Sequence, residues 1–298
     1  MQQDVIIIGG SFAGLSAAMQ LVRGQRNVTV IDAGQPRNRF AAQSHGFLGL
    51  DGVSPLEIQQ KASRQLLKYP TAKIIESKAK AVTETTTGFA VTLDDGKQLH
   101  SRKLILATGL RDELPAIPGI KERWGTTIIH CPYCHGYEFR NQPLGVIATG
   151  PISAHQASMI PDWGPTTYFT QGVYEPDEEQ YAFLIKRGVT IESTPVLEVL
   201  GRAPAISSVY LADGRTINVN ALFIGPKTHM SSPFAKQLGC EFEEGPMGLV
   251  IKVNEMKETS VKGVFAAGDV SNPMQNATFA SASGVMAGVG AHFSLMHD

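Results

Sequence analysis

Residues 4–34, DVIIIGGSFAGLSAAMQLVRGQRNVTVIDAG, constrain the fold more than any other part of the chain. An apolar run at Val5–Ile8 is followed by a turn of small residues, a segment with helical periodicity, and a second apolar run at Val28–Asp32. This order predicts a strand, a helix and a parallel strand, so we expect an α/β fold. The residues on the expected buried face of the helix are Leu15, Ala18, Met19 and Val22.

The turn in this unit carries a modified glycine fingerprint. Gly9 and Gly14 occupy the first and third positions of G-x-G-x-x-G, where glycine permits the sharp turn and the close approach of helix to strand. Ser11 replaces the middle glycine. The free N–H groups of the helix start would still face a phosphate, and Asp32 ends the second strand where a carboxylate accepts hydrogen bonds from a ribose. The unit therefore predicts a dinucleotide site.

Two later stretches repeat the pattern of a buried strand that ends in small residues. KLILATGL spans residues 103–110, and in TSVKGVFAAGDV the apolar run Val264–Ala267 ends in Gly268 and Asp269. Ligands of open α/β sheets bind beyond the carboxyl ends of the strands. Asp269 is therefore a second candidate ligand-binding carboxylate.

Composition narrows the class of protein. A length of 298 residues suits two domains, and the 43% of residues that are apolar are enough to form their cores. The net charge of −1 gives no reason to expect nucleic acid or a membrane as a partner. The first apolar run is too short for a signal peptide or a membrane span, so we expect a cytoplasmic protein. Three cysteines exclude a secreted disulfide framework, and we expect Cys240 to be an inert packed residue.

The motif HCPYCHGYE, residues 130–138, allows three interpretations. C-x-x-C-H fits the attachment of a c-type haem, which normally accompanies export. A zinc site needs four ligands, of which Cys131, Cys134 and one histidine would supply three. A redox disulfide needs only the two cysteines, and a helix start with neighbouring imidazoles favours the thiolate.

A resemblance to a known family favours the third interpretation. IIIGGSFAG, LILATG and GVFAAGDV occur in the order and spacing of flavoprotein disulfide reductases with two dinucleotide domains, and the size resembles the low-molecular-weight thioredoxin reductases. CPYCHGYE and RNRFAAQSHGFLGLDG, residues 37–52, are similar to the branch that includes dithiol oxidases. The resemblance implies a homodimer of chains with two Rossmann-like three-layer domains. An FAD-binding domain (1–113 and 242–298) would carry an inserted NADPH-type domain (116–240) that holds the C-x-x-C.

The same resemblance implies an FAD site. Asp32 would meet the adenosine ribose, Asp269 the ribityl-pyrophosphate region and Gln275 the flavin. The helix after Gln275 would aim its N-terminus at the flavin. The full implied set is Gly9, Ser11, Phe12, Ala13, Gly14, Asp32, Arg39, Thr108, Gly109, Gly268, Asp269, Gln275, Asn276 and Ala277.

The resemblance also assigns roles in the C-x-x-C motif. Cys134 would face the flavin, and Cys131 would attack the partner disulfide. Thioredoxin reductases usually carry an acidic aspartate directly after the second cysteine, and this chain has His135 there. Since an imidazole exchanges protons near neutral pH, we expect His135 to be the acid–base. The secondary candidates for this role are His130, Glu138 and His45.

The expected middle domain departs from the family in its nucleotide motif. In LGVIATGPISAHQ, Ala148 and Ser153 take the first and third glycine positions, and only Gly150 is kept. The next strand is expected at Thr166–Thr170. An NADPH site would have arginines after this strand to bind the 2′-phosphate, but this chain has carboxylates there. We therefore expect no NADPH binding of the usual kind. The carboxylates are Glu175, Asp177, Glu178 and Glu179.

The sequence thus predicts an FAD-dependent thiol–disulfide oxidoreductase, similar to thioredoxin reductase, that passes electrons between flavin and the Cys131–Cys134 pair. Its partner would be a thioredoxin-like protein or a small dithiol or disulfide, and its electron donor a ferredoxin or a second flavin. Two alternatives remain open: an oxygen-dependent oxidase of a small dithiol, and a non-catalytic FAD-binding redox sensor.

Overall fold

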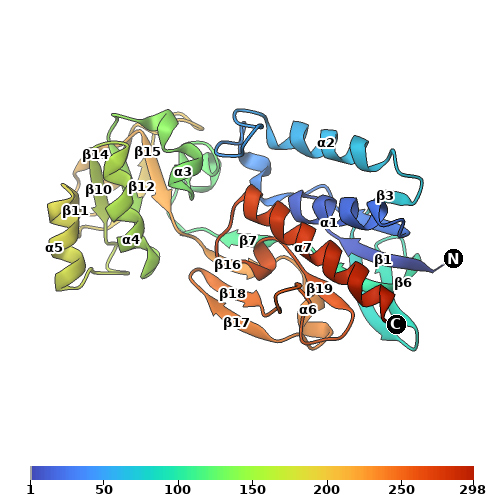
Figure 1. The fold of residues 1–298 in the computed structure, drawn as a ribbon. Coiled ribbons are helices and arrows are strands. Elements are labelled where there is room, and N and C mark those ends of the chain that lie inside the picture. The colour runs from blue at the N-terminus through green and yellow to red at the C-terminus, as the bar shows by residue number, and fades with distance from the viewer. Residues whose placement is uncertain (1) are drawn as a thin grey trace. The chain divides into compact units, whose positions relative to one another are not determined.

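A computed structural model describes residues 2–298 of the chain. The chain divides into two compact units (Figure 1). The first unit comprises Met1–Arg39, Pro55–Arg111 and Thr228–Asp298, and the second comprises Phe40–Ser54 and Asp112–Lys227. We describe each unit by itself.

This division differs from the expected domain boundaries at two places. The loop Phe40–Ser54 belongs to the second unit, where Phe40 lies so close to Gly125 that a Cβ there would come 2.5 Å from the Cβ of Phe40. The second unit also ends at Lys227 instead of residue 240. The reason is that Phe234 and Cys240 are buried in the core of the first unit.

The first unit is built on a mainly parallel sheet with strand order β3-β2-β1-β6-β5-β4 and with β19 also paired to β6. The four strands β3, β2, β1 and β6 and the added β19 run parallel, whereas β5 and β4 are antiparallel. The strands are β1 (Gln3–Ile8), β2 (Val28–Asp32), β3 (Ala72–Glu76), β4 (Ala79–Thr85), β5 (Gly88–Leu93), β6 (Gln98–Leu106) and β19 (Val264–Ala266). Two further pairs of strands form separate two-stranded sheets. One is the hairpin of β17 (Phe242–Gly245) and β18 (Gly248–Ile251), and the other joins β7 (Leu110–Glu113) to β16 (Lys227–Met230).

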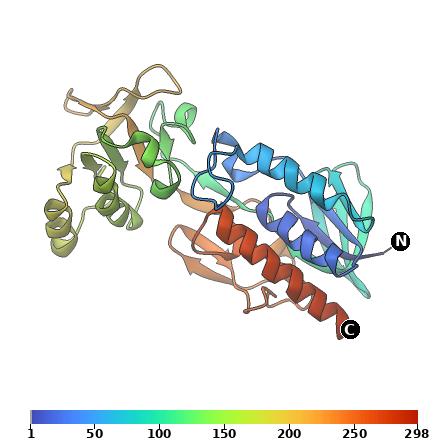
Figure 2. The same ribbon diagram turned by 45° about the horizontal axis from the view of Figure 1, so that its top comes forward.

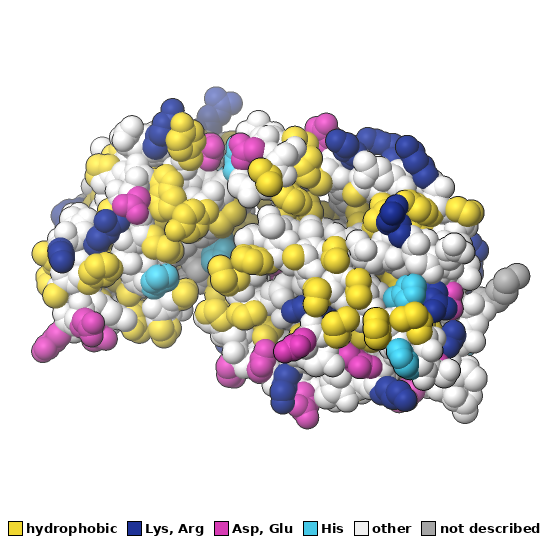
Figure 3. Space-filling view, viewed as in Figure 1, with side chains coloured by type: hydrophobic (Ala, Val, Ile, Leu, Met, Phe, Trp, Pro, Cys, Tyr) yellow, Lys and Arg dark blue, Asp and Glu magenta, His cyan; other side chains and the backbone are white. Residues whose placement is uncertain are grey.

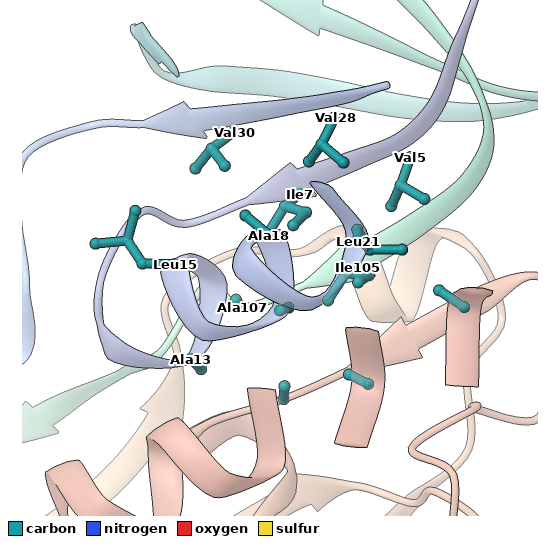
Figure 4. Packing of buried hydrophobic residues seen from close by; sticks show 14 of the residues in the cluster. Val5, Ile7, Ala13, Leu15, Ala18, Leu21, Val28, Val30, Ile105 and Ala107 are labelled. Atoms are coloured by element: carbon teal, nitrogen blue, oxygen red, sulfur yellow. The ribbon is translucent and has the colours of Figure 1, made fainter. Parts of the chain in front are cut away.

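Three helices lie side by side over one face of this sheet (Figures 1 and 2). They are α1 (Phe12–Arg23), α2 (Pro55–Leu66) and α7 (Ala277–Met296), and the short helix α6 (Phe234–Gln237) packs on the opposite face. Figure 4 shows Leu15, Ala18 and Leu21 of α1 pointing toward Val5, Val28 and Val30 of the strands. The helical periodicity of the sequence therefore predicts the buried face correctly, except that Met19 is only partly buried.

The second unit has a parallel sheet with strand order β11-β10-β9-β15-β8. Helices α4 and α5 contribute Ala157 and Leu184 to the core on one face, and a three-stranded antiparallel sheet supplies Val199 and Val209 to the other. The strands are β8 (Ile128–Ile129), β9 (Leu144–Ile147), β10 (Thr166–Phe169), β11 (Thr190–Glu192), β12 (Val196–Leu200), β13 (Ser208–Leu211), β14 (Thr216–Asn218) and β15 (Ala221–Ile224). The helices are α3 (Pro132–His135), α4 (Ile152–Met159) and α5 (Glu178–Lys186). Each unit is thus a three-layer α/β structure, as the family resemblance implies.

Helix α7 is the one helix among residues 2–298 that is long and apolar enough to cross a membrane by length and composition. One of its faces is buried against α1, because Gly284 and Gly288 let the backbones approach closely: a Cβ at Gly284 would lie 2.1 Å from the carbonyl oxygen of Ala13. This packing is that of a core helix of the first unit.

Candidate functional site

The turn between β1 and α1 has the tight geometry that the glycine fingerprint predicts. Gly9 has a φ of +110°, and a Cβ at Gly14 would lie 1.8 Å from the carbonyl oxygen of Gly9. Ser11 is the N-cap of α1 and makes no side-chain cap hydrogen bond. The N-terminus of α1 therefore keeps its positive end of the helix dipole and backbone N–H donors for an anionic ligand such as a phosphate.

Asp32 lies beside this turn, at the end of β2. A Cβ on Gly10 would come 2.6 Å from the Cβ of Asp32, so glycine is required for the carboxylate to sit here. The amide of Gln59 on α2 donates to the Asp32 carboxylate over 3.1 Å and to the carbonyl oxygen of Gly10 over 2.8 Å. Gln59 thus fixes the orientation of Asp32, a role that nothing in the sequence pattern indicated.

A second cluster joins residues that are more than 200 positions apart. The guanidinium of Arg37 forms an ion pair of 3.0 Å with Asp269 and donates a short hydrogen bond to Gln275. Both partners of the ion pair are about four-fifths buried. Arg39, which the sequence favoured, is exposed and donates to the carbonyl oxygen of Pro36. Arg37, not Arg39, contacts the predicted site residues Asp269 and Gln275. Its position two residues before Arg39, in RNRF, is the feature of the sequence that could have indicated it.

The remaining predicted FAD residues lie at the same carboxyl edge of the sheet. Thr108 and Gly109 follow β6, and Gly268, with a φ of +82°, follows β19 and donates its N–H to Ser283. Asn276 caps α7 by accepting the N–H of Phe279 over 2.7 Å, so Ala277 is the first helical residue. Phe12 and Ala13 begin α1. The first unit therefore brings together most of the predicted set on its own.

The cysteine pair lies in the second unit as a disulfide. Cys131 is the N-cap of α3, Pro132 is its first residue, and the two cysteine Cα atoms are 5.3 Å apart. A helix start was predicted here, but α3 is a single turn, so its dipole contributes little to a thiolate. Trp163 packs against Gly136 and meets Tyr133 edge-on at 5.5 Å, which holds the turn against the unit's core. Within residues 2–298 no group of three histidine, cysteine or acidic side chains could hold a metal ion.

His135 follows the disulfide directly and is partly buried. Burial lowers the pKa of its imidazole, the nearby carboxylate of Glu138 opposes this effect, and His45 adds to it. His45 reaches this place on the loop Phe40–Ser54, with its ring 6.3 Å from that of His135 in an edge-on arrangement. The neutral form of His135 is therefore favoured at neutral pH, and a neutral imidazole can accept a proton from a thiol.

His130 has a different environment from His135. Its Nδ1 lies 3.2 Å from the carbonyl oxygen of Ile224, and its own carbonyl oxygen accepts a hydrogen bond from Gln156 on α4. Gln156 is buried and holds the residue that precedes Cys131. These contacts fix the entry into α3, and sequence reasoning missed Gln156.

In the nucleotide-like loops of the second unit, side chains form hydrogen bonds within the chain itself. The hydroxyl of Ser153 accepts the backbone N–H of Thr149 over 2.9 Å, and the hydroxyl of Thr149 donates to the carbonyl oxygen of Gly225. After β10, the hydroxyl of Thr170 donates to the carboxylate of Glu175. These groups occupy the positions where a dinucleotide fold of this kind would present donors to phosphates.

Comparison with known proteins assigns the family. The model of the pyridine nucleotide-disulphide oxidoreductases matches residues 3–284. The chain belongs to this family. Thioredoxin reductase sirT of Leptosphaeria maculans is 32% identical over 310 residues, which cover 98% of this chain and 94% of sirT. Thioredoxin reductase tcpT of Claviceps purpurea is 32% identical over 307 residues, which cover 99% of this chain and 95% of tcpT.

A solved structure is similar over the full length. The oxidoreductase from Agrobacterium tumefaciens is 48% identical, with a TM-score of 0.95, and the match covers 100% of this chain and 99% of that one. This pyridine nucleotide-disulphide oxidoreductase is therefore an FAD-dependent enzyme of the thioredoxin reductase type.

The first unit of this oxidoreductase has the groups that FAD requires. The close approach at Gly9 and Gly14 leaves the α1 N–H donors open toward a pyrophosphate, and Asp32 presents acceptors for ribose hydroxyls. Asp269 and Gln275 would lie toward the flavin end, held by Arg37. Bound FAD supplies two-electron chemistry that suits a dithiol–disulfide couple.

Proposed function

We propose that this oxidoreductase exchanges electrons with a thioredoxin-like protein or a small dithiol or disulfide through Cys131 and Cys134, without using NADPH in the usual way. The observation that carries the proposal is the disulfide at the start of α3, followed directly by the partly buried imidazole of His135. Thiol–disulfide exchange needs a pair that can open, an attacking thiolate and a group that moves protons. These three requirements meet within five consecutive residues.

In the reducing direction, the thiolate of Cys131 attacks one sulfur of the partner disulfide. The partner's S–S bond breaks, a mixed disulfide forms, and the leaving sulfur takes a proton from protonated His135. Cys134 then attacks the Sγ of Cys131 and releases the second partner sulfur. Two electrons have passed to the partner and the Cys131–Cys134 bond is restored. Oxidation of a dithiol is the reverse sequence.

The hydrogen bonds within the loops of the second unit support the absence of usual NADPH binding. Ser153 is fully buried and uses the N–H of Thr149 that a phosphate would need. Glu175 lies where an arginine would be needed for a 2′-phosphate, and Arg187 is paired with Asp162 over 2.6 Å. The electrons of the reductase direction would therefore come from a ferredoxin or a second flavin.

The second candidate function is an oxygen-dependent oxidase of a small dithiol. The lowered pKa of His135 favours this direction, because a neutral imidazole accepts the proton of an attacking substrate thiol. The electrons would pass from the dithiol to the cysteine pair and then, through bound FAD, to oxygen.

One anaerobic experiment tests these functions. The flavin absorbance of the purified protein is followed while NADPH, NADH, reduced ferredoxin and a dithiol are added in separate samples. Rapid bleaching by NADPH would contradict the proposal. Bleaching by dithiol, with peroxide formed on aeration, favours the oxidase, and thioredoxin reduction from ferredoxin favours the reductase. A flavin that no donor or dithiol bleaches would indicate a non-catalytic redox sensor.

We further propose a homodimer that forms through α7. Its outward face carries apolar residues at alternating spacings of three and four, which is the pattern of two helices packed in a coiled-coil manner. Figure 3 shows hydrophobic side chains along the course of this helix. The stripe consists of Phe279, Ala282, Met286, Val289, Phe293 and Met296, all exposed. The occupant is a second copy, because α7 contains no Lys, Arg, Asp or Glu, so two copies meet without charge repulsion.

A cytoplasmic location completes the proposal. The two cysteines of the pair are the only ones in a disulfide among residues 2–298, and Cys240 is a buried free thiol. A single exchangeable pair and a free thiol suit a compartment in which thiols are kept reduced. Fractionation of cells with an antibody to the chain tests this location.

A further inference from the structure

The loop Phe40–Ser54 brings a second histidine to the cysteine motif. A Cβ at Gly46 would lie 4.0 Å from the carbonyl oxygen of Tyr133, so the loop runs against α3 itself. The N–H of Gly46 donates to Asp51 over 2.8 Å, which closes the loop and places Asp51 beside His45. His45 is one of the secondary acid–base candidates of the sequence, but its distance from Cys131 along the chain does not predict this arrangement.

Both ring nitrogens of His45 face carboxylates. Nδ1 lies 3.5 Å from Asp51 and Nε2 lies 3.6 Å from Glu138, and the side chain is only 18% exposed. Carboxylate oxygens only accept hydrogen bonds, and a neutral imidazole carries one N–H. Only the imidazolium form of His45 can present N–H groups to both carboxylates.

His45 is also a neighbour of His135. The two rings meet edge-on at 6.3 Å, and the ionisable groups that act on His135 are Glu138 and His45. A positive charge beside an imidazole opposes its protonation, whereas a carboxylate favours it. His45 and Glu138 therefore act on His135 in opposite directions, and Glu138 is shared between the two rings.

We propose that His45, held by Asp51 and Glu138, is a positioning residue that keeps His135 in its neutral, proton-accepting form. The inference rests on the proposed exchange at Cys131 and Cys134. His45 acts through His135 and transfers no proton itself.

The step that this arrangement assists is the entry of a substrate thiol. The thiol gives its proton to His135, and the resulting thiolate attacks the Sγ of Cys131. The Cys131–Cys134 bond breaks, a substrate–Cys131 disulfide forms, and Cys134 leaves as a thiolate. The second thiol of the substrate then attacks the substrate sulfur in the mixed disulfide; its proton passes to the sulfur of Cys131, which is released as a thiol. The substrate has lost two electrons and the cysteine pair has gained them.

The test is a titration of the histidine rings in the full-length protein with its FAD. Histidines are labelled with ¹³C, the imidazole resonances are followed against pH, and the His135 signal is assigned from its loss in His135→Gln. We expect His45→Gln to raise the pKa of His135 by about half a unit or more, and Asp51→Asn to shift it in the same direction. We expect Glu138→Gln to lower it. His155→Gln, at an exposed position on α4 of the same unit, should leave it unchanged.

A second measurement links the titration to the exchange. Dithiothreitol opens the Cys131–Cys134 disulfide, and the rate is measured from the appearance of thiols that can be alkylated. The pH midpoint of this rate should shift in each variant in the same direction as the pKa of His135. If the disulfide opens in all variants but the His135 pKa does not move with opposite signs in His45→Gln and Glu138→Gln, the inference is wrong and the proposed function stands. If no dithiol opens the disulfide of the unaltered protein, the proposed function itself is wrong.

Discussion

The hydroxyl of Ser153 accepts a hydrogen bond from the backbone N–H of Thr149 across the turn between β9 and α4. Ser153 stands at the third glycine position of the fingerprint and is fully buried. A serine in this place gives the loop an internal partner where a dinucleotide-binding protein has a phosphate.

We therefore expect NADPH to leave the melting temperature of the protein unchanged within about 1 °C, since only a ligand that binds the folded state stabilises it. Ser153→Ala should lower the free energy of unfolding by about 1 kcal/mol, because Thr149 loses its partner. Differential scanning fluorimetry with and without NADPH measures the first effect. Urea unfolding of the Ser153→Ala variant and of the unaltered protein measures the second. If millimolar NADPH raised the melting temperature of the unaltered protein by several degrees, the interpretation that Ser153 takes the place of a phosphate would be wrong.

The two cysteines are expected to respond differently to substitution. With Cys131→Ser, the remaining Cys134 should be a thiolate next to the flavin and give a long-wavelength charge-transfer absorbance at neutral pH. Cys134→Ser should give none, because Cys131 is assigned to the partner. Absorbance spectra of the two purified variants decide the matter, with the double variant as a control. A band in Cys134→Ser alone would reverse the assignment.

The stripe on α7 predicts the oligomeric state. Val289→Glu introduces a carboxylate into the middle of the proposed interface, and an unpaired buried charge costs several kcal/mol. We expect the dissociation constant of the dimer to rise at least about a hundredfold, measured by sedimentation velocity over a range of concentrations.

The matched control for this variant is Ile185→Glu, which makes the same kind of change at a half-exposed apolar position on α5. It should leave the dimer intact. A dimer that survives Val289→Glu, or an unaltered protein that sediments as a monomer, would refute the α7 interface. Flotation of the unaltered protein with lipid vesicles would show that the stripe meets a membrane instead.

Local patterns in the sequence predicted five strands of the two parallel sheets closely, whereas most of the other strands were not predicted. Val28–Asp32 is β2 without change, and the apolar runs expected at residues 5–8, 144–148, 166–170 and 264–267 correspond to β1, β9, β10 and β19 within two residues at either end. Buried parallel strands are continuous apolar runs that end in turns of small residues, so their limits are visible in the sequence.

The contacts between distant segments were not predictable in the same way. The ion pair of Arg37 with Asp269 and the approach of His45 to Glu138 depend on how loops fold back, and neither leaves a periodic signal. The family resemblance pointed to Arg39, which lies two residues after Arg37. Gln59 and Gln156 act through single hydrogen bonds to backbone and carboxylate groups, which residue types alone do not reveal.

The last prediction concerns the stability of the first unit against pH. The ammonium group of Lys103 is almost fully buried and lies 2.8 Å from the carboxylate of Asp298. The hydrogen bond from Lys103, assisted by Arg102, lowers the pKa of Asp298 below its ordinary value of 3.8. A carboxyl group whose pKa is lower in the folded state contributes stability above its unfolded pKa and loses that contribution as pH falls through the folded value. The contribution should therefore be complete above about pH 5 and decline below about pH 4.

Asp298→Asn should lower the free energy of unfolding by about 1–3 kcal/mol at pH 7, because Lys103 keeps its charge in a buried place without its anionic partner. The difference from the unaltered protein should shrink as the pH falls below about 4 toward the lowered pKa of Asp298 in the folded state. Urea unfolding at a series of pH values measures this. The double variant Lys103→Met/Asp298→Asn should recover much of the loss, since the buried charge is gone. An Asp298→Asn penalty that is the same at pH 7 and pH 3 would show that the lost stability comes from packing and not from the ion pair.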